Sequence, residues 1–299
     1  MKDARAEAAP VGLAVGRAPG RVADYVTLTK PRLNLLVVIT SAAGYYLASP
    51  EVPAWGPLIT TVIGTALVAS GAAVLNQVYE RDTDALMERT RRRPLPDGRV
   101  PPAEAGLFGI VLALAGIVAL LTIDRVAALL AVVTLAIYVA VYTPLKRRSA
   151  IATLVGAIPG ALPPLIGWTA ARGSTFGGGW ALFAIVFLWQ IPHFMAIAWM
   201  YREDYRKAGF PMLPVLEPDG ARTGRQAMLY AAALVPTALL PSINLAGTVY
   251  LGVALGLSLA LFGLAVTFAR SRSDNSARLL FYGTITYLPL LWAAMILDH

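Results

Sequence analysis

The stretch that decides the fold runs from residue 71 to residue 93 and reads GAAVLNQVYERDTDALMERTRRR. It begins as an apolar helix and ends as a dense cluster of acids and bases. If the helix continues across this boundary, Asn76, Glu80 and Asp84 lie four residues apart and share one face. Three oxygen-bearing side chains on one face need a cation among them, and Mg²⁺ prefers hard oxygen ligands. The stretch therefore predicts a magnesium site at the end of an apolar helix.

Basic residues follow these oxygens at once, at Arg81, Arg89 and residues 91–93. Carboxylates that hold Mg²⁺, beside guanidinium groups that hold whatever Mg²⁺ bridges, are typical of a diphosphate site. The alternative is an ordinary charged loop on the cytoplasmic side of a membrane. The acidic register begins inside the apolar segment, and this favours the diphosphate site.

The composition defines the class of protein. Of the 299 residues, 57% are hydrophobic and only 14% are charged, which is typical of an integral membrane protein. Runs long enough to cross a bilayer, roughly 20 residues each, occur at 33–50, 56–78, 104–122, 125–144, 150–170, 180–200, 226–243, 247–269 and 278–297. We therefore predict an all-α, polytopic membrane protein with about nine transmembrane helices.

The distribution of positive charge predicts the topology. If alternate loops share a side, only Arg125 and Arg172 of the 25 Lys and Arg residues fall on the other side. The positive-inside rule then places the N-terminus in the cytoplasm and the C-terminus outside. We expect the protein to lie in the cell inner (plasma) membrane. The same loops account for the net charge of +8, so no nucleic-acid partner is expected. Residues 1–24 are expected to form a disordered cytoplasmic arm, and residues 25–299 the transmembrane domain.

A second long loop, residues 201–225, also carries acids and bases where an apolar span ends. Glu203 and Asp204 precede Arg206 and Lys207. Two facing carboxylate clusters would bind one diphosphate through shared Mg²⁺ ions. Glu203 and Lys207 are also spaced as an ordinary surface helix pair, so both interpretations stay open for this loop.

Several motifs together carry a resemblance to a known family. The pattern Asn76-x-x-x-Glu80-x-x-x-Asp84 resembles the first signature of the membrane-embedded aromatic prenyltransferases. The resemblance is strongest to the haem-farnesylating branch, and it rests on the segments YTPLKRR (142–148), GAIPGALPP (156–164), WQIPHF (189–194) and DYRKAGFPMLP (204–214). It covers the chain from about Tyr25 to the end. Glu80 stands where the superfamily often has Asp, and Lys207 stands where many relatives have a further Asp, which leaves the number of Mg²⁺ ions open.

The resemblance implies transfer of a farnesyl group from farnesyl diphosphate to a vinyl group of protohaem IX (haem B). The product would be haem O for haem-copper oxidases. The cofactor would be Mg²⁺, and haem A synthase would be a partner. The implied metal ligands, which are also catalytic, are Asn76, Glu80, Asp84 and Asp204, with Lys146 as a further catalytic residue. The implied diphosphate ligands are Arg81, Arg89, Arg93, Lys146, Arg147, Arg206 and Lys207.

A histidine inside an apolar span marks the acceptor side. His193 follows Pro192, and an ionisable group at such a position is costly and therefore a functional candidate. The resemblance implies that His193 contacts the haem, as an axial contact. Trp189 is a candidate to bind the haem by stacking on the porphyrin. A hydrogen bond to a neighbouring helix is the alternative for His193, and interface anchoring is the alternative for Trp189. Prolines in the 150–170 and 180–200 runs are expected to kink these spans around a central cavity open to lipid.

Two other functions remain open at this point. Kinked helices, polar groups within spans and basic loops on one side also describe a transporter of an anionic substrate. Transporters usually place their polar site near the midplane, whereas both acidic clusters here lie at helix ends. Within the enzyme class, the acceptor is alternatively a quinone or chlorophyll precursor.

Overall fold

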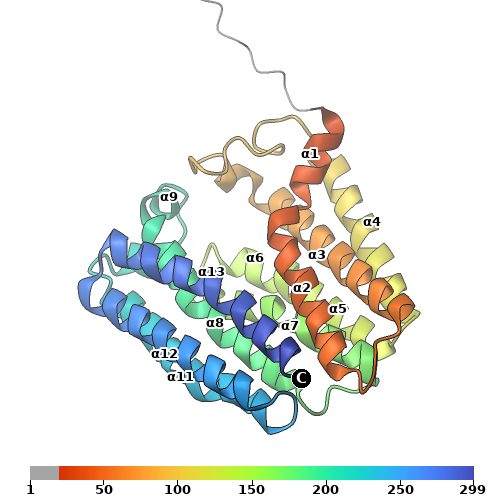
Figure 1. The fold of residues 1–299 in the computed structure, drawn as a ribbon. Helices are drawn as coiled ribbons and strands as arrows, with labels where there is room; N and C mark the ends of the chain where they lie inside the picture. Colours follow the sequence, from red (N-terminus) through yellow and green to blue (C-terminus); the bar gives the residue numbers. More distant parts are fainter. Residues whose placement is uncertain (1–19) are drawn as a thin grey trace, which may run out of the picture.

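The computed structural model describes residues 20–299, and every regular element in that range is helical (Figure 1). Residues 1–19 of the expected disordered arm lie outside the described residues. Arg21 to Asp24, which we also assigned to the arm, form the start of helix α1 (Arg21–Leu28), so disorder was the wrong expectation for them. The division into an arm and a domain otherwise stays a prediction.

Each of the nine predicted spans corresponds to a helix in the structure. The spans are α2 (Pro31–Ala48), α3 (Trp55–Asp84), α4 (Pro102–Leu121), α5 (Arg125–Ala136) continued by the π-helix η1 (Ile137–Tyr142) and α6 (Thr143–Leu145), α7 (Ala152–Arg172), α8 (Gly179–Met200), α11 (Ala221–Leu239) continued by the 3-10 helix η2 (Leu240–Ile243), α12 (Thr248–Ser271) and α13 (Asp274–Leu297). Two short helices, α9 (Arg202–Lys207) and α10 (Leu213–Leu216), lie in the 201–225 loop.

Eight of these helices, within residues 20–299, are long and apolar enough to cross a membrane. The remaining one is α2, whose 18 residues include Arg32 and Asn34 near its start. These two polar side chains lower the mean hydropathy of the helix, and the helix is too short to contain a more apolar segment of spanning length. The prediction of an all-α polytopic membrane protein is confirmed, with a count of eight by length and composition where we expected about nine.

The helices form two groups that meet along α7 and α8 (Figure 1). In the first group α3 packs on α2 and α4, and α7 packs on α2 and α5; in the second, α8 packs on α11 and α13, and α12 on both. Small residues allow close approach, since a Cβ at Gly71 would lie 2.5 Å from the Gly109 carbonyl oxygen and one at Gly116 would lie 2.5 Å from that of Gly64. Packing by small residues is usual between membrane helices, because lipid offers little hydrophobic drive for their association.

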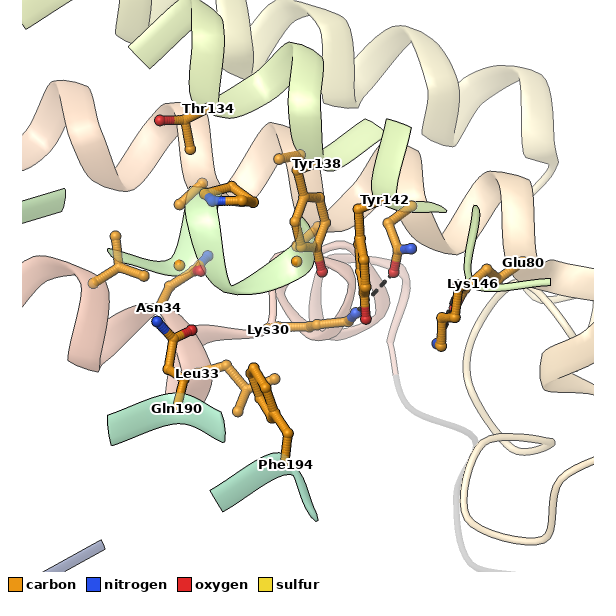
Figure 2. A pocket seen from close by; sticks show the side chains of 18 of the residues that line it. Lys30, Leu33, Asn34, Glu80, Thr134, Tyr138, Tyr142, Lys146, Gln190 and Phe194 are labelled. Atoms are coloured by element: carbon orange, nitrogen blue, oxygen red, sulfur yellow. Dashed lines mark hydrogen bonds and ion pairs between the residues drawn. The ribbon is translucent and has the colours of Figure 1, made fainter. Parts of the chain in front are cut away.

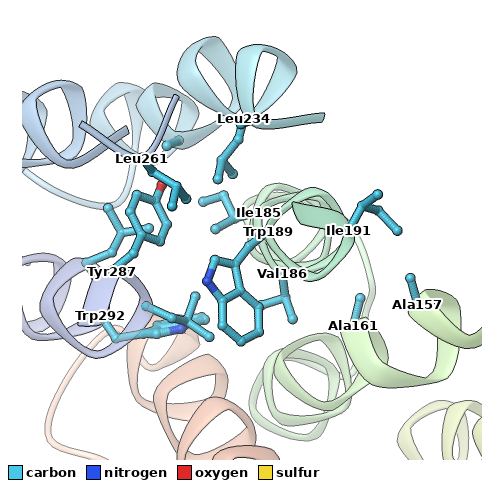
Figure 3. Close-up of a cluster of buried hydrophobic side chains, with 14 of the residues drawn as sticks. Ala157, Ala161, Ile185, Val186, Trp189, Ile191, Leu234, Leu261, Tyr287 and Trp292 are labelled. Atoms are coloured by element: carbon cyan, nitrogen blue, oxygen red, sulfur yellow. The ribbon is translucent and has the colours of Figure 1, made fainter. Parts of the chain in front are cut away.

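An apolar core fixes the orientation of α8 (Figure 3). Ile185 and Trp189 of α8 lie with Leu234 of α11, Leu261 of α12 and Tyr287 of α13. The Trp189 indole also donates its N–H to the backbone oxygen of Thr284, at 2.8 Å. With this face of α8 held in the core, the side chains of Gln190 and His193 line a cavity.

The expected prolines lie inside the helices that border this cavity. Pro159, Pro163 and Pro164 are interior to α7, and Pro192 is interior to α8. Pro159 and Pro163 line the cavity. Each proline deprives the carbonyl one turn earlier of its helical donor, and the kinks that we expect there stay a prediction.

Candidate active site

The end of α3 presents the predicted oxygen ligands on one face. The helix continues unbroken to Asp84, as the sequence required. Asn76, Glu80 and Asp84 are 3%, 2% and 1% exposed, and all three line one cavity of about 460 Å³. A buried polar group is costly unless it finds a partner, so the partners of these three side chains indicate what the site is built to hold.

In the structure each of the three faces a basic side chain. Lys146 places its Nζ 3.1 Å from both carboxylate oxygens of Glu80 (Figure 2). Arg93 donates from Nη1 to Asp84 Oδ2 at 2.7 Å. These ion pairs are largely buried, with side-chain exposures of 13% or less on the first pair. Anionic and cationic groups therefore lie next to each other in the lining of the cavity.

The donor set fits a magnesium ion. Asp84 Oδ1 is buried and has no hydrogen-bond partner among the described residues, so one acceptor at the site is unsatisfied. Asn76 donates from Nδ2 to Thr143 Oγ1 at 3.1 Å, which turns its Oδ1 the other way. Within residues 20–299, no group of three or more His, Cys, Asp or Glu side chains is placed to hold a metal ion by itself. Mg²⁺ commonly uses one or two carboxylates and completes its shell with water and substrate phosphate oxygens, and these residues suit that arrangement.

Lys30 belongs to the site, and the sequence analysis missed it. Its Nζ lies 3.4 Å from Asn76 Oδ1, and its backbone is left-handed, with φ 50° and ψ 57°, at the turn into α2. For a non-glycine residue this conformation costs about 1–2 kcal/mol. Burial, followed by repulsion from Arg93, lowers the pKa of Lys30 to about 7, and attraction to Glu80 opposes the shift. An anion among these cations would relieve that repulsion.

Aromatic side chains connect the two charged loops. Arg89 of the 79–103 loop donates from Nη2 to the Tyr205 hydroxyl at 2.8 Å, and its guanidinium lies 4.8 Å from the centre of the Tyr205 ring. Lys146 lies 4.7 Å from the centre of the Phe210 ring. Cation–π contacts of this kind hold a basic group in place without neutralising its charge. The 201–225 loop thus supports the cations of the cavity with its aromatic residues.

Five of the predicted ligands do not line the cavity. Asp204 is half-buried at the start of α9, next to Tyr205, which does line it. The other four are exposed basic residues, namely Arg81, Arg147, Arg206 and Lys207. Arg81 pairs with Asp82 at 3.1 Å, and Arg206 pairs with Glu203. The cavity therefore brings together Asn76, Glu80, Asp84, Arg89, Arg93, Lys146 and His193 of the predicted set.

His193 lies in the cavity wall on α8. Its ring stacks on Trp189, with centres 5.3 Å apart, and on Phe281, with centres 5.1 Å apart. His193 Nδ1 lies 2.8 Å from Thr284 Oγ1, whose hydrogen is directed to the Phe281 backbone oxygen at 2.6 Å. The hydroxyl therefore accepts from Nδ1–H, which leaves Nε2 as an acceptor. Trp189 supports the histidine from the core side and does not itself line the cavity.

Other cavity residues had no assigned role in the sequence analysis. Tyr138 and Tyr142 line the cavity from the π-helix η1, their ring centres 5.3 Å apart (Figure 2). A π-helical turn adds a residue to each hydrogen-bonded ring and is frequent at functional sites. Asn34 and Gln190 add amide groups. Both amides could have been predicted, because each is a polar residue inside an apolar run. We used this criterion only for His193.

The fold and the cavity define a class: a multi-pass membrane protein with one cavity that is lined by paired acids and bases and by apolar residues. The sequence matches the UbiA prenyltransferase family over residues 37–292. The chain therefore belongs to the UbiA prenyltransferase family, and the family predicted from the motifs is confirmed.

Curated relatives agree with this assignment. The chain is 45% identical to the protoheme IX farnesyltransferase of Solibacter usitatus over 287 residues, which cover 92% of this chain and 98% of the relative. It is 45% identical to that of Myxococcus xanthus over 284 residues, covering 94% and 96%.

Two solved structures share the fold. A structure of digeranylgeranylglyceryl phosphate synthase has a TM-score of 0.79 at 18% identity, covering 93% of this chain and 98% of that one. A UbiA homologue from Archaeoglobus fulgidus, bound to GPP and Mg²⁺, has a TM-score of 0.67 at 18% identity, covering 91% and 99%.

Proposed function

We propose that the protein transfers the farnesyl group of farnesyl diphosphate to a vinyl group of haem B, giving haem O. The observation that carries the proposal is a single cavity with two chemically different ends. One end holds the acids of α3 with their basic partners, among them Glu80 and Lys146 (Figure 2). The other end is largely apolar and includes His193. The farnesyltransferase relatives support the same assignment.

At the charged end, Asn76, Glu80 and Asp84 would hold Mg²⁺. The ion would supply charge neutralisation to the diphosphate oxygens and so make diphosphate a leaving group. Arg93 and Lys146 already lie beside these carboxylates and would turn to the diphosphate as the metal takes over the carboxylate oxygens. Arg89 and Lys30 border the same space. Asp204, Arg81, Arg147, Arg206 and Lys207 would join the set only if their loops move toward the cavity.

The chain's own residues then position and shield the reactants. The bond between farnesyl C1 and oxygen breaks with its electron pair going to diphosphate, and the vinyl π electrons form the new bond to C1. The positive charge moves to the vinyl carbon next to the porphyrin ring. Water adds to this carbon and loses a proton to the released diphosphate, which leaves a hydroxyl group. The rings of Tyr138 and Tyr142 line the cavity and favour positive charge near their faces. Orientation and exclusion of stray water supply the rest of the acceleration.

The acceptor would lie at the other end of the cavity. His193 Nε2 has no hydrogen-bond partner within residues 20–299, and Trp189 and Thr284 hold the ring in place. We propose that these residues orient the porphyrin. The haem O produced would pass to haem A synthase.

We also propose the orientation in the plasma membrane. The Lys and Arg distribution places the N-terminus in the cytoplasm and the C-terminus outside. The charged end of the cavity then lies on the cytoplasmic side. Reporter fusions after His299 and within residues 91–99 test this, and a cytoplasmic reporter at the C-terminus would reverse it.

The deciding experiment uses the purified protein in lipid nanodiscs with farnesyl diphosphate, haem B and Mg²⁺. We expect diphosphate release together with a farnesylated, hydrated haem in the mass spectrum, and loss of both when the metal is chelated. Quinone precursors and aromatic acids serve as alternative acceptors. Turnover with one of these but not with haem would overturn the acceptor, and transport across vesicles without a covalent product would overturn the enzyme class.

A further inference from the structure

The side chain of Gln190 is a buried amide in the wall of the cavity. It lies in α8, is 5% exposed and lines the same space as His193. Its Nε2 donates to the Val186 backbone oxygen at 3.0 Å, within α8, and to the Ala157 backbone oxygen of α7 at 3.3 Å. Both amide hydrogens are thus committed to carbonyls, and this fixes which way the amide faces.

The carbonyl oxygen of the amide has no hydrogen-bond donor among the described residues. Gln190 Oε1 accepts no hydrogen bond within residues 20–299, yet it is not one of the fully enclosed unpartnered atoms. It is therefore accessible, and the accessible space at this residue is the cavity. Gly160 leaves room for it, because a Cβ at position 160 would lie 2.1 Å from Oε1. Figure 2 shows Gln190 on the opposite side of the cavity from Glu80 and Lys146.

An acceptor with no donor in a nearly buried place calls for a ligand that donates. Neither organic substrate of the proposed reaction offers a donor at neutral pH. The farnesyl chain is a hydrocarbon, the diphosphate and the haem propionates are anionic acceptors, and iron replaces the pyrrole hydrogens of haem. Water is the reactant that carries O–H donors.

We infer that Gln190 is a positioning residue that holds the water molecule which completes the reaction. This inference rests on the proposed function. The water donates one hydrogen to Gln190 Oε1, so that an oxygen lone pair is free to bond to the cationic vinyl carbon. As this C–O bond forms, the water loses its other proton to the diphosphate released in the same cavity. The product then carries a hydroxyl group, and charge and atoms balance.

Without a held water, the same cation has another outcome. It loses a proton from the neighbouring carbon to diphosphate and becomes an alkene. That product is lighter than the hydroxylated one by the mass of one water molecule. The ratio of the two products therefore reports the water site and not the diphosphate site.

The test is the product ratio in two variants and a matched control. Gln190→Met removes the amide at nearly constant length. Gly160→Ala leaves the amide in place and displaces Oε1, the movable end of the side chain. The control is Gln77→Met, since Gln77 is buried with the same pattern, donating from Nε2 to the Leu28 oxygen at 2.7 Å and the Ala73 oxygen at 3.0 Å, but does not line the cavity.

We expect the ratio of hydroxylated to alkene product to fall by about tenfold in Gln190→Met and Gly160→Ala, and to stay at the wild-type value in Gln77→Met. If Gln190→Met does not fold, Gly160→Ala decides alone. Fully hydroxylated product in a folded variant would overturn the inference, and so would lost haem affinity with an unchanged ratio, because Gln190 would then bind the acceptor. Failure of the wild type to farnesylate haem would overturn the proposed function instead.

Discussion

The 79–103 and 201–225 loops have similar compositions and differ in what they contribute to the cavity. In each, a mixture of acids and bases follows an apolar span. The first loop places Arg89 and Arg93 in the cavity wall beside the carboxylates of α3. The second contributes Tyr205 and Met212, while its charged residues lie outside the lining. Similar charge patterns therefore do not predict similar sites.

The difference follows from helix continuity. α3 runs for 30 residues without a break, so the spacing of four holds from Asn76 to Asp84. α8 ends at Met200, where Tyr201 leaves the helical region with φ −110° and ψ 22°, and α9 starts a new helix. Neighbouring helical residues point about 100° apart, so with Tyr205 directed to the cavity, Asp204 is directed away from it.

The largest effect is expected at the carboxylate of the continuous helix. Glu80→Gln keeps the size of the side chain but removes the charge that would hold Mg²⁺ and that pairs with Lys146 at 3.1 Å. We expect turnover, measured as diphosphate release, to fall more than about 100-fold. Asp84→Asn should behave in the same way. Near-wild-type turnover with an unchanged Mg²⁺ requirement would remove these residues from the metal site.

A smaller effect is expected at the acid of the second loop. Asp204→Asn should raise the Mg²⁺ concentration for half-maximal turnover by about tenfold, because this carboxylate reaches the metal only if α9 moves. Titration of Mg²⁺ at saturating farnesyl diphosphate measures it. A loss as large as that of Glu80→Gln would mean that the two loops hold the ion equally in the bound state.

The spans and the shared face of α3 were predictable from patterns within one helix. Arg93, Lys146 and His193 were expected in the site from the family resemblance, and they line the cavity. The contacts that form between distant segments were not predictable. Apolar runs and a spacing of four suffice for the spans and for Asn76, Glu80 and Asp84. The sequence gives no signal for the π-helix that carries Tyr138 and Tyr142, since a π-helical turn depends on packing around it. The left-handed backbone at Lys30 and the contact of Arg89 with Tyr205 likewise appear only once distant segments meet.

The aromatic contact between the loops is the next test. Tyr205→Phe keeps the ring under Arg89 and removes the hydroxyl that accepts from it at 2.8 Å. We expect the KM for farnesyl diphosphate to rise about threefold to fivefold at nearly constant kcat, because Arg89 loses orientation but keeps its charge. Tyr201→Phe is the control, since Arg89 lies 5.0 Å from the centre of that ring and no hydrogen bond from Arg89 to its hydroxyl is formed. Equal effects of the two variants would assign the role to the rings alone.

The smallest effect is expected at the exposed bases of α9. Arg206 pairs with Glu203 on the surface, and both side chains are 61% exposed. Surface ion pairs contribute little to stability, and solvent screens the electrostatic interaction of their charges with groups in the cavity. Arg206→Gln should therefore change the KM for farnesyl diphosphate by less than about twofold.

The matched change in the first loop is Arg93→Gln, which removes the guanidinium that lies 2.7 Å from Asp84. We expect this variant to raise the same KM by at least about tenfold, since a charge-assisted contact of a largely buried group is lost. Both values come from initial rates of diphosphate release at saturating haem and Mg²⁺. If Arg206→Gln raises the KM as much as Arg93→Gln does, α9 closes over the bound diphosphate, and the contrast between the two loops holds only before the substrate binds.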